Sequence, residues 1–363
     1  MRKRTLIITL LWLAITVNAQ KKQLDHDAYD AWESVAQALV SNDGRYAVYI
    51  VAPQEGDSMM YVKDLKTMAE KRIERGFGPQ ISDDSRYLVF KIKPSQAEKK
   101  DARKKKRKAD EQPKDSLGWL QLGTQDVFRQ PEVKAYKMPE KASNYFAYQT
   151  AMPKDTAKNR KDEKHDYLIV YFLESGARDT ISFIDDYAVS KNGKYFAYTT
   201  KPSEKDSAAV PGVYLYDLSK RLSTLLQEGK GDYKLQAFDE DAVQFVFFAT
   251  TDTTKRDPKV YNLYYTRTDR PEARIIADTL SAQMPENWAV NTSRTSFSRD
   301  GKKLYFGISP IIAPKDTTID ASEQAQLDIW HYQDDYLQTV QLKQLRQELN
   351  RSYLCVFDVN DLS

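Results

Sequence analysis

The chain has 363 residues, of which 41% are hydrophobic, and a formal net charge of +3. This length suffices for one large repeat domain or two ordinary domains. The charge is too small to create a global field that would attract nucleic acid or an anionic membrane. The only cysteine, Cys355, excludes an internal disulfide and a cysteine-rich metal site.

The first 19 residues have the pattern of a secretory signal peptide. A basic start, Met1–Arg4, precedes an apolar run over residues 5–17 that is too short to span a bilayer comfortably. A small residue, Ala19, precedes Gln20, and we predict cleavage between these two residues. A buried N-terminal helix is the alternative, but such a helix rarely follows so basic a start. We expect an exported protein, periplasmic or extracellular, whose mature form spans 20–363 without a stable membrane anchor.

One short pattern recurs along the mature chain. It consists of a serine, a turn of Asp, Asn or Gly, a basic residue, and then alternating aromatic and aliphatic residues. Asp-Gly and Asn-Gly supply the positive φ angles of a tight turn, and the residues that follow favour strands. Each copy therefore predicts a strand that enters the turn and another that leaves it. Two weaker echoes cover 141–148 and 239–247, and the full copies begin at Ser41, Ser82, Ser190 and Ser298.

Further strands are predicted after these turns. Residues 30–39 form a short helical or extended lead-in, third strands fall at 72–74 and 274–276, and second strands fall at 59–65, 213–218, 261–266 and 327–332. Units of three or four strands at a spacing of about 40–60 residues are typical of β-propeller blades. We therefore predict an all-β fold, a β-propeller of about six blade starts that forms an incomplete ring with its last blade unfinished. A β-sandwich of unrelated strands is the alternative, and the recurrence of the whole unit argues against it.

A basic insertion at 95–117 interrupts the repeats, with a lysine-rich centre at 98–115. Such a run could bind nucleic acid, but this function conflicts with a signal peptide. The run also lacks the interleaved aromatic residues on which bases would stack. We interpret it as a solvated, partly helical loop and predict no nucleic-acid partner.

No sequence pattern of a catalytic or cofactor site is present. The Gly-x-Ser-x-Gly elbow, the Walker phosphate loop and the His-Glu-x-x-His zinc motif are all absent. The aspartate pairs at 83–84, 185–186 and 334–335 are poor candidates for sharing a proton or a metal, because adjacent residues on a strand point to opposite faces. We interpret them as solvated turn charges. His26, His165 and His331 are far apart in sequence, and His331, beside Trp330 in a predicted strand, is interpreted as an edge or core residue. We predict no catalytic residue, metal or cofactor in this chain.

Three parts of the sequence carry a more specific resemblance. They are the opening (26–32, 40–44 and 53–57), the end of the insertion (112–118), and a later region (327–330, 337–338 and 341–345). Together they resemble the N-terminal propeller of exported serine peptidases of the prolyl oligopeptidase family, in the form common among Bacteroidetes-type bacteria. The resemblance covers essentially the whole mature chain. It implies a propeller followed by an α/β-hydrolase domain that carries a Ser-Asp-His triad.

The chain stops at Ser363, before any such domain, and residues 353–359 have the pattern of a strand inside a blade. We therefore expect a fragment or a truncated gene. The resemblance implies that the parent protein hydrolyses peptides, that this propeller restricts their entry by size, and that the missing catalytic domain acts on them. A stand-alone periplasmic binding or scaffolding module is the alternative. A propeller enzyme with its own acid/base pair has no motif to support it.

Overall fold

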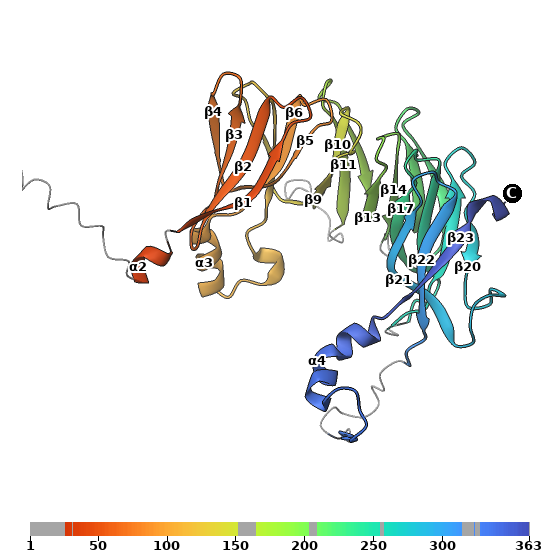
Figure 1. Cartoon of the computed structure of the whole chain (residues 1–363). Coiled ribbons are helices and arrows are strands. Elements are labelled where there is room, and N and C mark those ends of the chain that lie inside the picture. Colours follow the sequence, from red (N-terminus) through yellow and green to blue (C-terminus); the bar gives the residue numbers. More distant parts are fainter. Residues whose placement is uncertain are drawn as a thin grey trace, which may run out of the picture. The chain divides into compact units, whose positions relative to one another are not determined.

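The computed structural model describes residues 26–30, 32–151, 165–202, 209–254, 258–313, 323 and 327–362 (Figure 1). The predicted signal peptide and its cleavage site at Ala19–Gln20 lie outside these residues and stay predictions. The chain forms two compact units. Unit 1 comprises Met1–Val40, Gly44–Gly78 and Ile92–Pro113, and unit 2 comprises Ser41–Asp43, Pro79–Lys91 and Lys114–Ser363.

Unit 1 contains an antiparallel sheet with its strands in sequence order. The strands are β1 (Glu33–Val40), β2 (Tyr46–Pro53), β3 (Met59–Asp64) and β4 (Glu70–Glu74). Valine and isoleucine favour the pleated conformation of β2, and its inward-facing Val48 and Ile50 are buried. A four-residue helix, α2 (His26–Tyr29), precedes β1. The predicted lead-in at 30–39 is therefore mainly extended.

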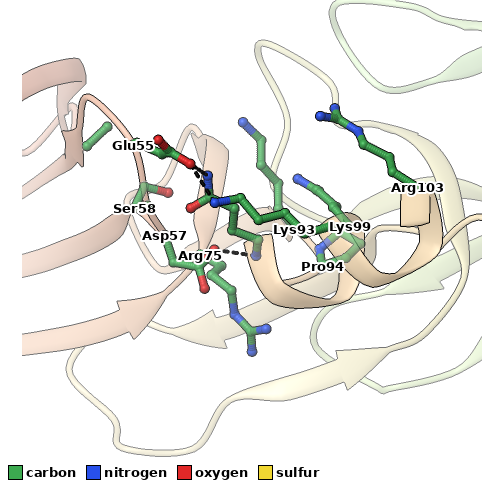
Figure 2. Close-up of a pocket in the computed structure, with 12 residues that line it drawn as sticks. Glu55, Asp57, Ser58, Arg75, Lys93, Pro94, Lys99 and Arg103 are labelled. Atoms are coloured by element: carbon green, nitrogen blue, oxygen red, sulfur yellow. Dashed lines mark hydrogen bonds and ion pairs between the residues drawn. The ribbon is translucent and has the colours of Figure 1, made fainter. Parts of the chain in front are cut away.

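The basic insertion contributes helix α3 (Gln96–Lys104) and a 3₁₀ turn, η2 (Ala109–Glu111), to unit 1. Ser95 begins the helix with a capping box: its hydroxyl accepts a hydrogen bond from the Glu98 amide, and the Glu98 carboxylate accepts one from the Ser95 amide. Asp57, in the β2–β3 loop, accepts a bond of 2.9 Å from the Gln96 amide and ties the helix start to the sheet (Figure 2). The prediction of a partly helical insertion is confirmed, although strand β7 already begins at Ser116.

Five further antiparallel sheets follow along the chain, and each has its strands in sequence order. Four of them have four strands and the last has three in the described residues. The strands are β5 (Gly76–Ile81), β6 (Tyr87–Ile92), β7 (Ser116–Gln121) and β8 (Phe128–Gln130); β9 (Val133–Lys137), β10 (Tyr145–Ala151), β11 (Asp166–Phe172) and β12 (Arg178–Ser182); β13 (Ile184–Val189), β14 (Tyr195–Thr200), β15 (Gly212–Asp217) and β16 (Leu222–Glu228); β17 (Asp232–Phe238), β18 (Gln244–Thr250), β19 (Asn262–Arg267) and β20 (Arg274–Ala277); and β21 (Trp288–Phe297), β22 (Lys303–Pro310) and β23 (Tyr353–Asp358).

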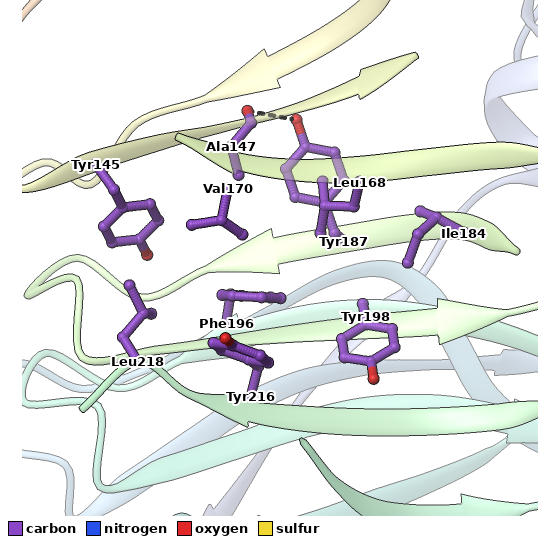
Figure 3. Close-up of a cluster of buried hydrophobic side chains, with 10 residues drawn as sticks. All are labelled: Tyr145, Ala147, Leu168, Val170, Ile184, Tyr187, Phe196, Tyr198, Tyr216 and Leu218. Atoms are coloured by element: carbon purple, nitrogen blue, oxygen red, sulfur yellow. Dashed lines mark hydrogen bonds between the residues drawn. The ribbon is translucent and has the colours of Figure 1, made fainter. Parts of the chain in front are cut away.

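The cores of unit 2 lie between successive sheets. Along β10, Tyr145 and Ala147 pack against the sheet that follows (Figure 3). Phe146 and Tyr148 pack against the sheet that precedes. Strand β18 is buried along its whole length in the same way, because neighbouring residues of a strand point to opposite faces. The inner sheets are covered on both faces as propeller blades are, and the fold is an all-β propeller with six blade sheets in the described residues.

The recurring sequence pattern builds the same turn in at least three blades. In the second blade the Ser82 hydroxyl donates to Asp84 at 2.6 Å and accepts from the Tyr87 amide at 2.9 Å, which closes the turn between the first two strands. The copies that begin at Ser190 and Ser298 make the same pair of bonds. The strands that follow the six copies are β2, β6, β10, β14, β18 and β22, each the second strand of its blade. The predicted number of blade starts is confirmed.

These turns also hydrogen-bond to one another through unit 2. The Asn42 side chain donates to Asp83, the Asp84 amide to the Ser143 hydroxyl, and the Lys141 amide to the Lys191 carbonyl. Further along, the side chain of Asn192 donates to the Asp241 carbonyl, and that of Gln244 donates to the Gly301 carbonyl at 2.8 Å. The serine copies therefore close their turns, and residues of the turns also join neighbouring blades.

Two local expectations near the C-terminus are wrong or incomplete. Residues 327–332, predicted as a strand, form no regular element, and the amide of His331 instead donates to Asp334 in a turn. The third strand of the last blade is β23, which pairs with β22 and confirms the strand expected at 353–359. Between them lies helix α4 (Gln338–Leu349), which we did not predict. A strand needs a neighbouring strand with which to pair, and apolar alternation alone does not supply one.

Candidate interaction surface

The three histidines and the single cysteine, which could act in catalysis, each lie beside an aromatic ring or a hydrophobic core. Each histidine ring lies near an aromatic ring, at centroid distances of 5.5 Å for His26 and Tyr29, 4.1 Å for His165 and Phe183, and 4.8 Å for His331 and Tyr332. Cys355 packs against the last core, and burial raises the pKa of its thiol, which disfavours the reactive thiolate. Within the described residues, no group of three His, Cys, Asp or Glu side chains is arranged to hold a metal ion.

The aspartate pairs are only partly as predicted. The pair at 83–84 lies in the β5–β6 turn, where Asp84 accepts hydrogen bonds from Ser82 and Arg86. The pair at 334–335 lies in the bend before α4. The pair at 185–186 lies instead within β13, where its pairing with β14 shifts register between Ile184 and Tyr187. The interpretation as turn charges is therefore wrong for that pair.

A surface in unit 2 exposes an unusual number of large apolar side chains. Almost half of the exposed large apolar side chains lie between residues 327 and 356, with exposed fractions from 48% for Tyr353 to 89% for Tyr332. We call this set the C-terminal apolar surface: Leu327, Ile329, Trp330, Tyr332, Tyr336, Leu337, Leu342, Leu345, Leu349, Tyr353, Leu354 and Val356. Extended apolar patches of this kind are typical of interaction sites, whereas single exposed apolar residues are ordinary.

Helix α4 presents one apolar stripe of this surface. Leu342, Leu345 and Leu349 are spaced i, i+3 and i+7, which places them on one face, and each is about half exposed. No residue of α4 is buried, and its N-cap, Leu337, makes no side-chain capping bond. An isolated helix of only about 12 residues is marginally stable in water. The exposed stripe and the weak cap leave α4 with little burial among the described residues.

Strand β23 presents the other part of the surface. Its side chains alternate: Cys355 and Phe357 pack into the last core, while Leu354 and Val356 are exposed at 74% and 54%. In each of the other five sheets a fourth strand pairs with the third. In the described part of the chain, no strand pairs with the second edge of β23. An uncovered edge with apolar side chains is a template for a further strand.

A shallow hollow of about 300 Å³ separates the helix from the strand. Ser309, Pro310 and Ile312, at and just after the end of β22, line it together with Glu348, Leu349, Arg351 and Tyr353. Leu349 of the α4 stripe and Tyr353 of β23 both line this hollow, so these two members of the C-terminal apolar surface lie close together.

The sequence indicates part of this surface but not its environment. The family resemblance includes residues 327–330, 337–338 and 341–345, and the apolar alternation predicts a strand at 327–332. Their exposure could not be predicted, because buried and exposed apolar side chains have the same residue types in the sequence. The helical spacing of Leu342, Leu345 and Leu349 was the available signal for α4.

None of the helices in the described residues has the length and apolar character that a membrane crossing requires.

No protein-family model and no curated protein matches the chain. Among solved structures, an acylaminoacyl peptidase from Pyrococcus horikoshii is similar at 10% identity and a TM-score of 0.43, over 79% of this chain and 44% of the peptidase. The propeller domain of the trilobed protease from Pyrococcus furiosus is similar at 12% identity and 0.42, over 77% and 79%. TolB from Acinetobacter baumannii is similar at 15% identity and 0.33, over 67% and 56%. The chain thus spans less than half of the acylaminoacyl peptidase, and likenesses at these scores carry no conclusion about function.

Proposed function

We propose that this chain is the substrate-gating propeller of an exported serine peptidase of the prolyl oligopeptidase type. In this proposal the propeller docks on an α/β-hydrolase domain and limits, by size, the peptides that reach the catalytic serine. The chemistry belongs to that second domain. We propose the export, the peptidase activity and the peptide substrate together with this gating role.

The C-terminal apolar surface is the observation that carries the proposal. Its residues include those that carry the sequence resemblance, namely Leu327, Ile329 and Trp330, and the stripe of α4. A gating propeller needs a face on which the catalytic domain sits. Burial of large apolar side chains contributes roughly 1.5–3 kcal/mol for each one that becomes fully covered, so a domain that covers this surface would be held firmly.

The first test is the reading frame beyond codon 363. The proposal expects it to continue into a Gly-x-Ser-x-Gly region. A frame that ends at Ser363, together with a folded monomeric product that hydrolyses no peptide, would refute the peptidase and leave the stand-alone binding module.

The second test uses the protein that the whole frame encodes. We expect the double variant Leu342→Asp/Leu345→Asp to lose the size limit or to lower peptidase activity by about tenfold, because two charges at the interface oppose docking. Leu280→Asp is the matched control, since Leu280 is 89% exposed and lies outside the surface. Equal effects of the two variants would show that the surface does not contact the catalytic domain.

A further inference from the structure

The basic insertion packs against the first sheet and forms part of a pocket, which a fully solvated loop would not do. A pocket of about 350 Å³ opens in unit 1 where α3 meets the first sheet (Figure 2). The β2–β3 loop at 55–58, Arg75 after β4, residues 93–96 after β6, and α3 form its walls. Elements that are distant in sequence therefore build one concave site.

Two carboxylates hold the frame of this pocket together. Asp57 accepts the hydrogen bond from the Gln96 amide at the start of α3. Glu55 pairs with the Lys100 ammonium group at 2.5 Å and accepts a bond of 3.2 Å from the Gln96 side chain. The hydrogen bond from Lys100 lowers the pKa of Glu55, which keeps that pair charged. Both acidic side chains in the lining are thus engaged in fixing the walls.

Three of the four remaining cations in the lining have no carboxylate partner among the described residues. Lys93, Lys99 and Arg103 form no ion pair with a carboxylate in the described part of the chain, and their side chains rise on one side of α3 (Figure 2). Arg75 has only a loose contact, 3.9 Å from its Nη1 to the Glu98 carboxylate. The Nε atom of Arg75 is buried without a hydrogen-bond partner among the described residues.

Without a ligand, the spacing of the cations along α3 destabilises the helix. Lys99 and Arg103 are four residues apart, so their like charges share one helix face and destabilise the helix. Elsewhere on the same helix the spacing is used differently, since Lys105 pairs with Asp101 four residues earlier at 2.9 Å. The Lys99–Arg103 pair lies in the pocket lining, where a bound anion would relieve its repulsion.

We propose that this pocket binds a phosphate-bearing ligand. Five cationic and two anionic side chains line it, which leaves three positive charges. That excess fits a multiply charged phosphate or pyrophosphate group better than a single carboxylate. Arginine can bind two oxygens of such a group at once, and lysine adds a mobile point charge. The phosphate group can come from a small soluble molecule or from a lipid headgroup, and the proposal does not depend on the peptidase assignment.

The test is a titration of the full chain with inorganic pyrophosphate by calorimetry at two salt concentrations. We expect saturable binding that Lys99→Gln/Arg103→Gln weakens by about tenfold or more, which corresponds to the loss of about 1.4 kcal/mol of binding free energy. The matched control is Lys104→Gln, which removes one charge from the same helix outside the pocket lining and should change the affinity less than about twofold. Equal weakening by both variants, or no binding to the wild-type chain, would overturn the proposal.

A stability measurement separates ligand binding from damage to the fold. The double variant should unfold at an equal or higher temperature than the wild type without ligand, because a like-charge pair is removed, and should lose the stabilisation that pyrophosphate gives. Citrate that binds as tightly as pyrophosphate would contradict a phosphate site. Binding to phosphatidylcholine vesicles only when they contain phosphatidic acid, with weak pyrophosphate binding, would identify the headgroup as the source, and preference for pyrophosphate would identify a soluble ligand.

Discussion

Two tyrosines in one core provide a test in which similar substitutions should have opposite effects. Tyr145 and Tyr187 are both almost fully buried in the cluster of Figure 3. The Tyr145 hydroxyl has no hydrogen-bond partner in the described residues, whereas that of Tyr187 donates to the Ala147 carbonyl at 3.2 Å. A buried polar group without a partner costs about 1–3 kcal/mol, and a neutral hydrogen bond contributes about 0.5–1.5 kcal/mol. Tyr145→Phe should therefore raise the free energy of unfolding by about 1 kcal/mol, and Tyr187→Phe should lower it by a similar amount.

Urea unfolding followed by circular dichroism measures both changes. The midpoint should shift in opposite directions with an unchanged denaturant slope, which would show that stability and not compactness has changed. Alkaline unfolding gives a second readout. Burial raises the pKa of Tyr145 above its ordinary value, so the stability linked to its neutral form is lost as pH rises beyond about 10, and Tyr145→Phe removes this loss. If Tyr145→Phe destabilised the chain as much as Tyr187→Phe, the hydroxyl would have a partner and the reasoning would fail.

Two further outcomes test the blade cores and the contacts between turns. Phe247 is fully buried between two blades, so Phe247→Ala should lower the free energy of unfolding by about 3–5 kcal/mol, whereas Leu280→Ala at an exposed position should change it by less than about 0.5 kcal/mol; equal urea midpoints would refute this packing. Hydrogen bonds from Lys141 and Lys191 lower the pKa of Glu240 from its ordinary value of 4.5 to about 2. The stability that this shift provides is present above pH 4.5 and is lost as pH falls toward 2, so Glu240→Gln should be less stable than wild type at pH 7 and equally stable near pH 2. Unfolding curves across that range, with the exposed Glu272→Gln as the control, measure the difference, and a gap that does not change with pH would contradict the assignment.

Much of the fold could be predicted because the turn motif acts locally. Ser82, Asp84 and Tyr87 close their turn with bonds that span at most five residues, so the motif has the same consequence wherever it occurs. The run from Tyr145 to Tyr148 shows how a second strand is recognised, since a strand between two neighbours is apolar on both faces. The pocket beside α3 was less predictable. The repulsive pair on α3 was visible in the sequence, but the pocket exists because Asp57 and Glu55, about 40 residues earlier, fix the helix against the sheet.

The amino-acid sequence by itself determined the blade repeat, the six turns and the helical insertion, because each depends on hydrogen bonds and side-chain spacing within a few residues. Only the tertiary structure decided which apolar residues are covered. Ile329 and Leu263 have similar apolar side chains, yet Leu263 is fully buried while Ile329 is 68% exposed. The physical reason is that burial depends on the position of distant elements, and no local rule sets whether a neighbouring blade or another domain supplies the covering surface.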